Sequence, residues 1–106
     1  MKRGEVYWVA FDPSIGSEIQ KTRPAVIVSR DASNRNVGRV TVVPFTQSIA
    51  NVFIGEAIVH LSGKMSKAVA DQIATVDKTR VRDRIGWLSP PELKAVEEAI
   101  RAHLEL

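Results

Sequence analysis

The sequence predicts a mainly β protein: a small antiparallel sheet, curled toward a barrel, with one helix at the C-terminal end of the chain. Two patterns predict this class. Short stretches of β-branched and aromatic residues are separated by clusters of turn-forming residues, and a single segment near the C-terminus has helical periodicity. At 106 residues the chain is long enough for one domain with a core. We therefore expect residues 1–106 to form one domain, with the helix on one side of the sheet.

The first half of the chain contains three expected strands. Glu5–Phe11 is mostly apolar on both faces, so we expect other elements to cover both sides of it. Pro24–Ser29 is a short apolar run, typical of a buried strand. Val40–Phe45 contains Pro44, whose missing backbone N–H predicts a sheet edge, a bulge or the end of the strand. The residues between the last two strands, Arg30–Asn36, are a cluster of turn formers.

The second half contains two further strand patterns, Glu56–Leu61 and Lys67–Val76. Asp71 and Gln72 interrupt the latter. An acid and an amide inside an apolar strand need hydrogen-bond partners or a water-filled cleft, so these residues lie either at a bonded sheet edge or in a functional site.

The strongest local signal in the chain is the sequence Ser-Pro-Pro-Glu at 89–92. Ser89 is expected as the N-cap, Pro90 at the first helical position and Glu92 as its capping-box partner. The apolar residues that follow recur at helical spacing and predict a helix packed on the sheet through Leu93, Val96, Ile100 and Leu104.

Positive charge is concentrated at Lys78–Arg84. Such a run could line a path for phosphates, but runs of charge are usually solvated, and we interpret this one as an exposed face. Trp87, which follows it, is expected in the core rather than as a base-stacking platform. The formal net charge of +3 permits an anionic partner without requiring one.

The composition excludes several kinds of chemistry. The chain has no cysteine, which rules out disulfides, thiolate nucleophiles and zinc sites built on sulfur, and fits a reducing cytoplasm. The two histidines, His60 and His103, fall in different elements, and we expect His60 to be structural. No apolar stretch resembles a signal peptide or a membrane span. We expect a cytoplasmic protein with no metal, no cofactor and no membrane partner.

A long segment without periodicity, 12–22, precedes Arg23 and Pro24. Loops of this length in small domains are often functional. Here the loop ends with a cation at the mouth of an apolar strand, while proline restricts the backbone behind it. Taken alone, this pattern favours an ordinary solvated arginine.

If the protein is an enzyme, it must work with guanidinium, hydroxyl, carboxylate and amide groups. RNA cleavage by the substrate's own 2′-hydroxyl is compatible with this limited set, because the protein needs only to orient the nucleophile and neutralise the phosphorane. Arginine suits the second task, since its planar fork donates two hydrogen bonds to phosphate oxygens. Composition alone does not select this reaction from the alternatives.

Several motifs, in matching order over nearly the whole chain, resemble the MazF/PemK (Kid) family of bacterial toxin ribonucleases, most closely its MazF branch. The segments that carry the resemblance are Arg3–Trp8, Phe11–Pro13, Gly16–Glu18, Thr22–Ser29, Val43–Thr46 and Ala70–Gln72.

The resemblance implies an SH3-like barrel, a homodimer, and metal-independent, sequence-specific cleavage of single-stranded RNA that leaves 2′,3′-cyclic phosphate and 5′-hydroxyl ends. It also implies an antitoxin protein whose acidic, partly disordered segment covers the RNA groove. The modest positive charge of this chain suits both anionic ligands.

The resemblance also assigns roles to individual residues. Arg23 matches the family's phosphorane stabiliser and candidate proton donor, and Thr46 matches the hydroxyl that contacts the scissile phosphate or orients the 2′-hydroxyl. The PemK branch has an arginine two residues before the position of Asp71, where this chain has Val69, so that branch's acid–base set does not transfer and the general base is unidentified. Further RNA contacts are expected from Ser17, Glu18, Gln20, Lys21, Gln47 and Asp71.

Two alternatives are open. The first is a toxin of the same barrel that binds without catalysis, like the CcdB relatives that inhibit DNA gyrase. The second is a degenerate member that only binds RNA or its antitoxin. Incubation with RNA in the presence of a chelator separates an active ribonuclease from both.

Overall fold

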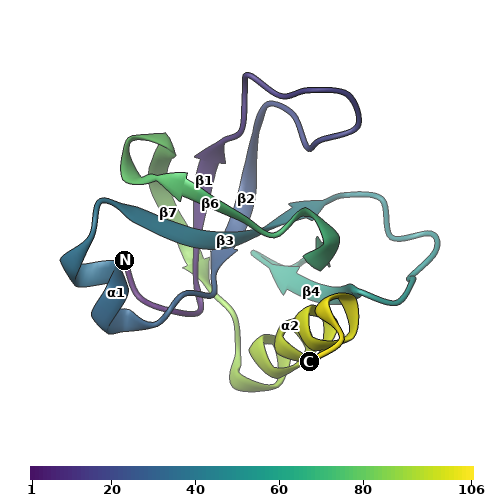
Figure 1. Cartoon of the computed structure of the whole chain (residues 1–106). Coiled ribbons are helices and arrows are strands. Elements are labelled where there is room, and N and C mark those ends of the chain that lie inside the picture. The colour runs from purple at the N-terminus through teal and green to yellow at the C-terminus, as the bar shows by residue number, and fades with distance from the viewer.

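A computed structural model describes all residues, 1–106, and contains seven strands, two α-helices and two 3₁₀ turns (Figure 1). Their order is β1 (Glu5–Ala10), β2 (Thr22–Ile27), α1 (Asp31–Asn36), β3 (Arg39–Thr46), β4 (Glu56–Leu61), β5 (Lys64–Val69), the turn η1 (Ala70–Gln72), β6 (Ala74–Asp77), the turn η2 (Lys78–Arg80), β7 (Val81–Trp87) and α2 (Pro90–Leu104). The predicted class, a mainly β protein with a C-terminal helix, is confirmed.

All strand pairs are antiparallel, in the order β4-β5-β3-β2-β1-β7, and β6 pairs with β3 as a side branch. The sheet curls strongly, and α2 lies below one half of it (Figure 1). β3 organises the sheet, because residues 39–42 pair with β6 while Phe45 and Thr46 pair with β5. Pro44 lies between the residues of β3 that pair with β6 and those that pair with β5. Its missing backbone N–H therefore interrupts neither of these two ladders. The predicted edge, bulge or strand end is wrong: Pro44 lies inside β3.

Two apolar clusters lie on opposite faces of the sheet, and β2 contributes to both of them. Val26 belongs to the cluster under α2, whereas Ala25 and Ile27 belong to the other, and all three are fully buried. Alternation of side chains across a strand places neighbours on opposite faces, so a strand covered on both sides is apolar at every position. The predicted buried strand at this position is confirmed.

Two predictions are wrong: that β1 is covered on both sides and that Trp87 is buried in the core. β1 is not covered on both sides along its length: Val6 and Val9 are buried, but Trp8 is 42% exposed. Trp87 is not in the core either, since 69% of it is exposed. β7 pairs only with β1 and is an edge strand, and Trp87 lies opposite Glu5 on a face that no other strand covers. Each strand therefore has an apolar side chain on a face that stays open to solvent.

Two further segments differ from their predictions. The turn formers at Arg30–Asn36 fold into the short helix α1, where the buried Asn34 amide donates to the Ser29 carbonyl oxygen at 3.0 Å. The single strand expected at Lys67–Val76 is two strands, β5 and β6, separated by η1. Asp71 and Gln72 therefore lie on a turn rather than within a ladder.

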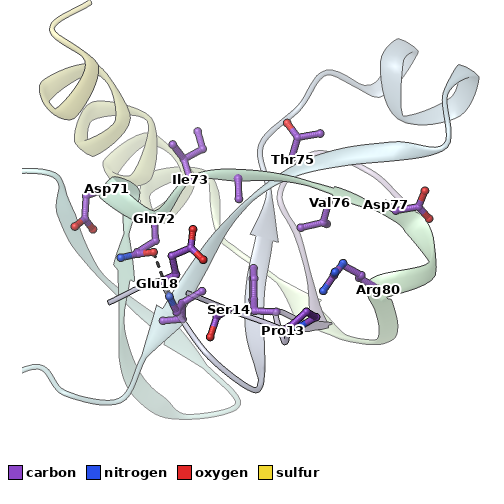
Figure 2. A pocket seen from close by; sticks show the side chains of 13 residues that line it. Pro13, Ser14, Glu18, Asp71, Gln72, Ile73, Thr75, Val76, Asp77 and Arg80 are labelled. Carbon is purple, nitrogen blue, oxygen red and sulfur yellow. Dashed lines mark hydrogen bonds between the residues drawn. The ribbon is translucent and has the colours of Figure 1, made fainter. Parts of the chain in front are cut away.

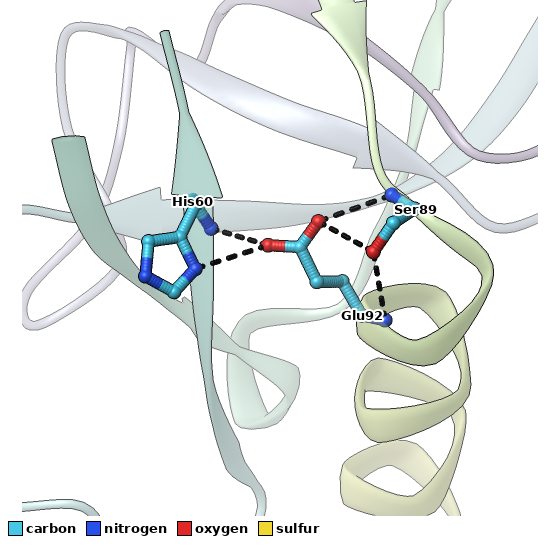
Figure 3. A network of polar contacts seen from close by, with 3 residues as sticks. All are labelled: His60, Ser89 and Glu92. Carbon is cyan, nitrogen blue, oxygen red and sulfur yellow. Dashed lines mark hydrogen bonds and ion pairs between the residues drawn. The ribbon is translucent and has the colours of Figure 1, made fainter. Parts of the chain in front are cut away.

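The helix α2 begins as predicted. Figure 3 shows the capping box: the Ser89 hydroxyl accepts from the Glu92 backbone N–H, and the Glu92 carboxylate accepts from the Ser89 N–H. The other carboxylate oxygen accepts the His60 backbone N–H of the edge strand β4 at 2.6 Å. Val96 is fully buried, whereas Leu104 is 47% exposed beyond the core. Neither helix is both long and apolar enough to cross a bilayer.

Candidate functional site

Arg23 and Thr46 lie together in a pocket of about 380 Å³ between the start of β2 and the end of β3. The sheet register brings them there. The ladder between β2 and β3 ends at the pair Ala25 and Pro44, and Arg23 and Thr46 each lie two residues beyond it. The pocket is lined by Trp8, Lys21, Thr22, Arg23, Pro24, Phe45, Thr46, Gln47 and Ser66.

The Arg23 guanidinium is held by the loop that precedes it. Its Nε donates to the Gln20 carbonyl oxygen at 2.9 Å, and its Nη groups take part in no hydrogen bond or ion pair within the chain. The base of the loop is closed beside it, because the Phe11 N–H donates to the Lys21 carbonyl oxygen at 2.9 Å. One edge of the guanidinium is therefore anchored, while the other can donate two parallel hydrogen bonds to an oxyanion.

The Thr46 hydroxyl is oriented by the next turn of the chain. Its Oγ1 accepts the Ser48 backbone N–H at 3.0 Å. A hydroxyl has one proton and two acceptor positions, so this contact occupies an acceptor position and leaves the O–H free to donate. Arg23 and Thr46 thus both have donors free in the pocket that they line.

The charge of this pocket favours an anion. Lys21 and Arg23 are cationic, and no carboxylate or imidazole is among the lining residues. A phosphate group satisfies such a set of donors, whereas a cation would be repelled. The same composition means that the lining residues include no ordinary general base.

A second pocket, of about 510 Å³, lies along β6 and the β1–β2 loop and has the opposite character (Figure 2). Glu18, Asp71 and Asp77 line it together with Arg80. Arg80 is engaged, since its Nη1 donates to the carbonyl oxygens of Ala10 and Asp12. The loop is attached to η1 on this side by a 3.2 Å hydrogen bond from the Ile19 N–H to the Gln72 side-chain oxygen.

The structure thus divides the predicted RNA-contacting residues. Lys21 and Gln47 lie with Arg23 and Thr46, whereas Glu18 and Asp71 lie in the acidic pocket. Ser17 and Gln20 are exposed and line neither pocket. Gln20 does reach the site through its backbone, by accepting from Arg23.

The basic cluster at Lys78–Arg84 forms no continuous path of free charges. Arg82 donates to the Thr79 carbonyl oxygen, and Arg84 forms a 2.8 Å ion pair with Glu5. With Arg80 also engaged, the cluster mainly fastens η2 and β7 to their neighbours. Three arginines of the run thus bind groups of the chain itself, which argues against a phosphate path.

Sequence reasoning missed Trp8 and Ser66 as members of the Arg23 pocket. Trp8 pairs with Pro24 across β1 and β2, and Ser66 lies on β5 beside the end of β3. Finding either one requires the strand register, although the aromatic content of the first strand pointed to Trp8. No cluster of three or more metal-ligating side chains is present anywhere in the chain.

The curled sheet, the packed helix and the cationic pocket define a small β protein equipped to hold an anionic ligand. The sequence profile described as "PemK-like, MazF-like toxin of type II toxin-antitoxin system" matches residues 2–104. The chain therefore belongs to this PemK/MazF toxin family, as the motifs predicted.

Two curated relatives are similar over the full chain. Endoribonuclease MazF9 of Mycobacterium tuberculosis is 37% identical, with 100% of this chain and 98% of the relative covered. Endoribonuclease MazF of Staphylococcus saprophyticus is 33% identical, with 100% of this chain and 92% of the relative covered.

Among solved structures, MazF of Deinococcus radiodurans superposes with a TM-score of 0.89 at 22% identity, covering 100% of this chain and 97% of that one. A mycobacterial endoribonuclease in complex with its cognate antitoxin superposes with a TM-score of 0.83 at 24% identity, covering 100% of this chain and 96% of that one. The two structures show that the fold is shared.

Proposed function

We propose that this protein is the toxin of a type II toxin–antitoxin system and that residues 1–106 form one endoribonuclease domain. Its substrate is single-stranded RNA, cut at a short sequence without a metal ion to leave 2′,3′-cyclic phosphate and 5′-hydroxyl ends. The observation that carries the proposal is the placement of Arg23 and Thr46 in one cationic pocket, each with donors free. The full-length relatives named endoribonucleases support it.

In this reaction the 2′-oxygen loses its proton and attacks phosphorus, the bond from phosphorus to the 5′-oxygen breaks, and the 5′-oxygen takes up a proton to become the 5′-hydroxyl. Negative charge grows on the two non-bridging oxygens, and donors already in place stabilise the transition state without reorganising. The free Nη edge of Arg23 and the hydroxyl of Thr46 supply such donors, and Lys21 adds positive charge. The proton of the 2′-hydroxyl leaves to a group outside the pocket's own lining, because arginine is a poor base.

We also infer a cytoplasmic homodimer that is neutralised by an antitoxin with an acidic segment. The chain carries a net charge of +3, and the two cations of the Arg23 pocket have no ion-pair partner in the chain. An acidic segment that competes for this pocket would exclude RNA by occupying the same donors. A mycobacterial endoribonuclease of this fold is known in complex with its cognate antitoxin.

The decisive experiment incubates the purified protein with single-stranded RNA in excess EDTA and maps the ends of the products. We expect cleavage at a recurring short motif, cyclic phosphate at the 3′ end of each upstream product and hydroxyl at the 5′ end of each downstream one. A substrate with 2′-deoxyribose at the mapped position serves as the matched control and should remain intact. Uncut RNA overturns the proposal: a gel shift alone indicates a degenerate RNA-binding member, and no RNA binding indicates a gyrase-inhibitor type of toxin.

A further inference from the structure

Trp8 is an exposed aromatic side chain on the wall of the Arg23 pocket. The other aromatic residue of that pocket, Phe45, is buried in the core at 2% exposure, whereas Trp8 is 42% exposed. Tryptophan is highly buried on average, because its ring is large and mostly apolar. An indole left open to solvent within a pocket is a surface that a planar ligand can cover.

A regular strand positions Trp8, which lines the same pocket as the catalytic candidates. Trp8 pairs with Pro24, and the next pair along the strands is Val9 with Arg23. Cross-strand partners share a face of the sheet, so the rigid ring of Pro24 is the neighbour of the indole. Trp8 is thus placed by a regular strand, one pair of residues from Arg23, rather than by the loop.

The contents of the pocket match the two parts of a nucleotide. Lys21, Arg23 and Thr46 offer positive charge and a hydroxyl donor for a phosphate, and Trp8 adds a flat apolar surface for a base. No carboxylate lines the pocket to favour a cationic ligand or to repel the phosphate. We propose that Trp8 stacks on the base of the nucleotide next to the phosphate held by Arg23 and Thr46. This inference rests on the proposed ribonuclease function and adds an RNA-binding residue to the same site.

Stacking predicts that Trp8 contributes affinity for RNA and that other groups determine the cleavage sequence. Every base has a π face, so an aromatic platform raises affinity for single-stranded RNA with little preference among bases. Trp8 therefore increases the occupancy of the site, and the choice of cleavage sequence comes from other groups. A loss of Trp8 should weaken cleavage at all sites alike.

Fluorescence tests the contact directly, because Trp8 and Trp87 are the chain's two tryptophans. Trp87 lies outside the pocket, so Trp87→Phe leaves Trp8 as the sole indole signal without altering the site. The probe is a random-sequence 2′-O-methyl RNA, which cannot be cleaved because its 2′-oxygen is blocked. We expect this RNA to quench the Trp87→Phe protein, and inorganic polyphosphate, which has no bases, to leave it bright.

The reciprocal protein, Trp8→Phe, reports Trp87 alone and is expected to show little change with the same RNA. Binding is followed in parallel by the anisotropy of a labelled copy of the probe. Binding without quenching of Trp8 overturns the proposal, as does an indole that acrylamide cannot reach in the free protein. This measurement keeps Trp8 in place, so it does not depend on whether substitutions at that position fold.

Cleavage kinetics test the consequence. Trp8→Ala is expected to weaken the apparent affinity for substrate about tenfold or more, with the loss mainly in KM and the mapped motif unchanged. Trp8→Phe keeps a π face and should retain most of the affinity, whereas Trp8→Leu should resemble alanine. Trp87→Ala is the matched control and should cleave as the wild type does. Equal KM values for the wild type and Trp8→Leu overturn the proposal.

The two proposals fail in different ways. If the wild type quenches with RNA but cuts none, the stacking contact stands and the ribonuclease assignment falls. If the wild type cuts RNA while Trp8 shows neither quenching nor an effect on KM, the ribonuclease stands and the stacking contact is overturned.

Discussion

Arg23 and Thr46 line one pocket just beyond the end of the β2–β3 ladder, although 22 residues separate them in the chain. The loop before β2 holds the guanidinium through the Gln20 carbonyl oxygen, and the turn after β3 holds the hydroxyl through the Ser48 N–H. Each side chain is therefore oriented by a contact from its own segment. Both side chains line one pocket and keep donors free.

Replacing Arg23 by alanine should nearly abolish RNA cleavage while leaving the fold intact. Loss of a preorganised donor to a developing oxyanion lowers rates about 10²- to 10³-fold, and Arg23 also supplies charge. Arg23→Lys retains the charge but not the fork, so it should recover only part of the rate. Arg35, exposed on α1, provides a charge-matched control: Arg35→Ala should cleave normally. Cleavage retained by purified, folded Arg23→Ala would remove Arg23 from the site.

Thr46→Val should lower cleavage about tenfold or more, because valine has nearly the same shape but cannot donate a hydrogen bond to phosphate. The Ser48 N–H loses its acceptor but lies at the surface and can bind water, so the free energy of unfolding should change by less than about 1 kcal/mol. Thr46→Ser keeps the hydroxyl and should restore most of the activity. Rate assays beside thermal melts separate the two effects. A valine variant as active as the serine variant would contradict the assigned role.

Features encoded within a few consecutive residues could be predicted from the sequence. The capping box needs only Ser89 and Glu92, and the buried β2 needs only its apolar run. The site could be predicted as far as Arg23 and Thr46 through motif resemblance, whereas their adjacency follows from the register between β2 and β3.

The wrong predictions share a physical cause. Composition reports whether a side chain is apolar but not whether another element covers it, so it predicts covered tryptophans, whereas Trp8 on an inner strand and Trp87 on an edge strand are both exposed. Pro44 predicts an edge, a bulge or a strand end from the local pattern alone, because the exchange of partners along β3 is a property of the whole sheet. The pattern predicts a strand at Asp71 because a 3₁₀ turn of three residues leaves no periodic signal.

Glu92 makes part of the stability depend on pH (Figure 3). Burial alone would raise the pKa of Glu92, but hydrogen bonds from the backbone N–H groups of Ser89 and His60 and from the Ser89 hydroxyl bring it below the ordinary value of 4.5. A lowered pKa means that the ionised form stabilises the fold. This stabilisation is complete above about pH 4.5 and is lost as the pH falls through the lower value in the folded state.

Glu92→Gln should therefore reduce the free energy of unfolding by about 1 kcal/mol near neutral pH and by progressively less in acid. Glutamine retains an acceptor oxygen but carries no charge, so the variant isolates the ionised state. Urea unfolding of both proteins at several pH values gives the comparison. Glu98→Gln, on the same helix, removes a carboxylate whose side chain makes no hydrogen bond or ion pair, and its effect should be small throughout. A difference between wild type and Glu92→Gln that persists unchanged in acid would contradict the assignment.

Lys67 fastens the irregular connection between β3 and β4, which begins beside the Arg23 pocket at Gln47. Its side chain is 8% exposed, and its Nζ donates to the Asn51 carbonyl oxygen at 2.8 Å and lies 3.0 Å from the Glu56 carboxylate. The Phe53 backbone N–H and then Lys67 hold the pKa of Glu56 below its usual range. The buried ammonium thus ties β5 to a segment that has no strand partner of its own.

Lys67→Met should lower the free energy of unfolding by about 3 kcal/mol, because it leaves the Glu56 carboxylate and the Asn51 carbonyl without their partner. Adding Glu56→Gln to this variant should recover part of the loss, since the unpaired charge is then removed as well. Chemical denaturation of the two single variants and the double variant gives the coupling energy. Hydrogen exchange in residues 47–55 should speed up most in Lys67→Met, because the tether acts there. Strictly additive single effects would show that Lys67 and Glu56 stabilise the protein independently, and unchanged exchange would show that the connection is held by other contacts.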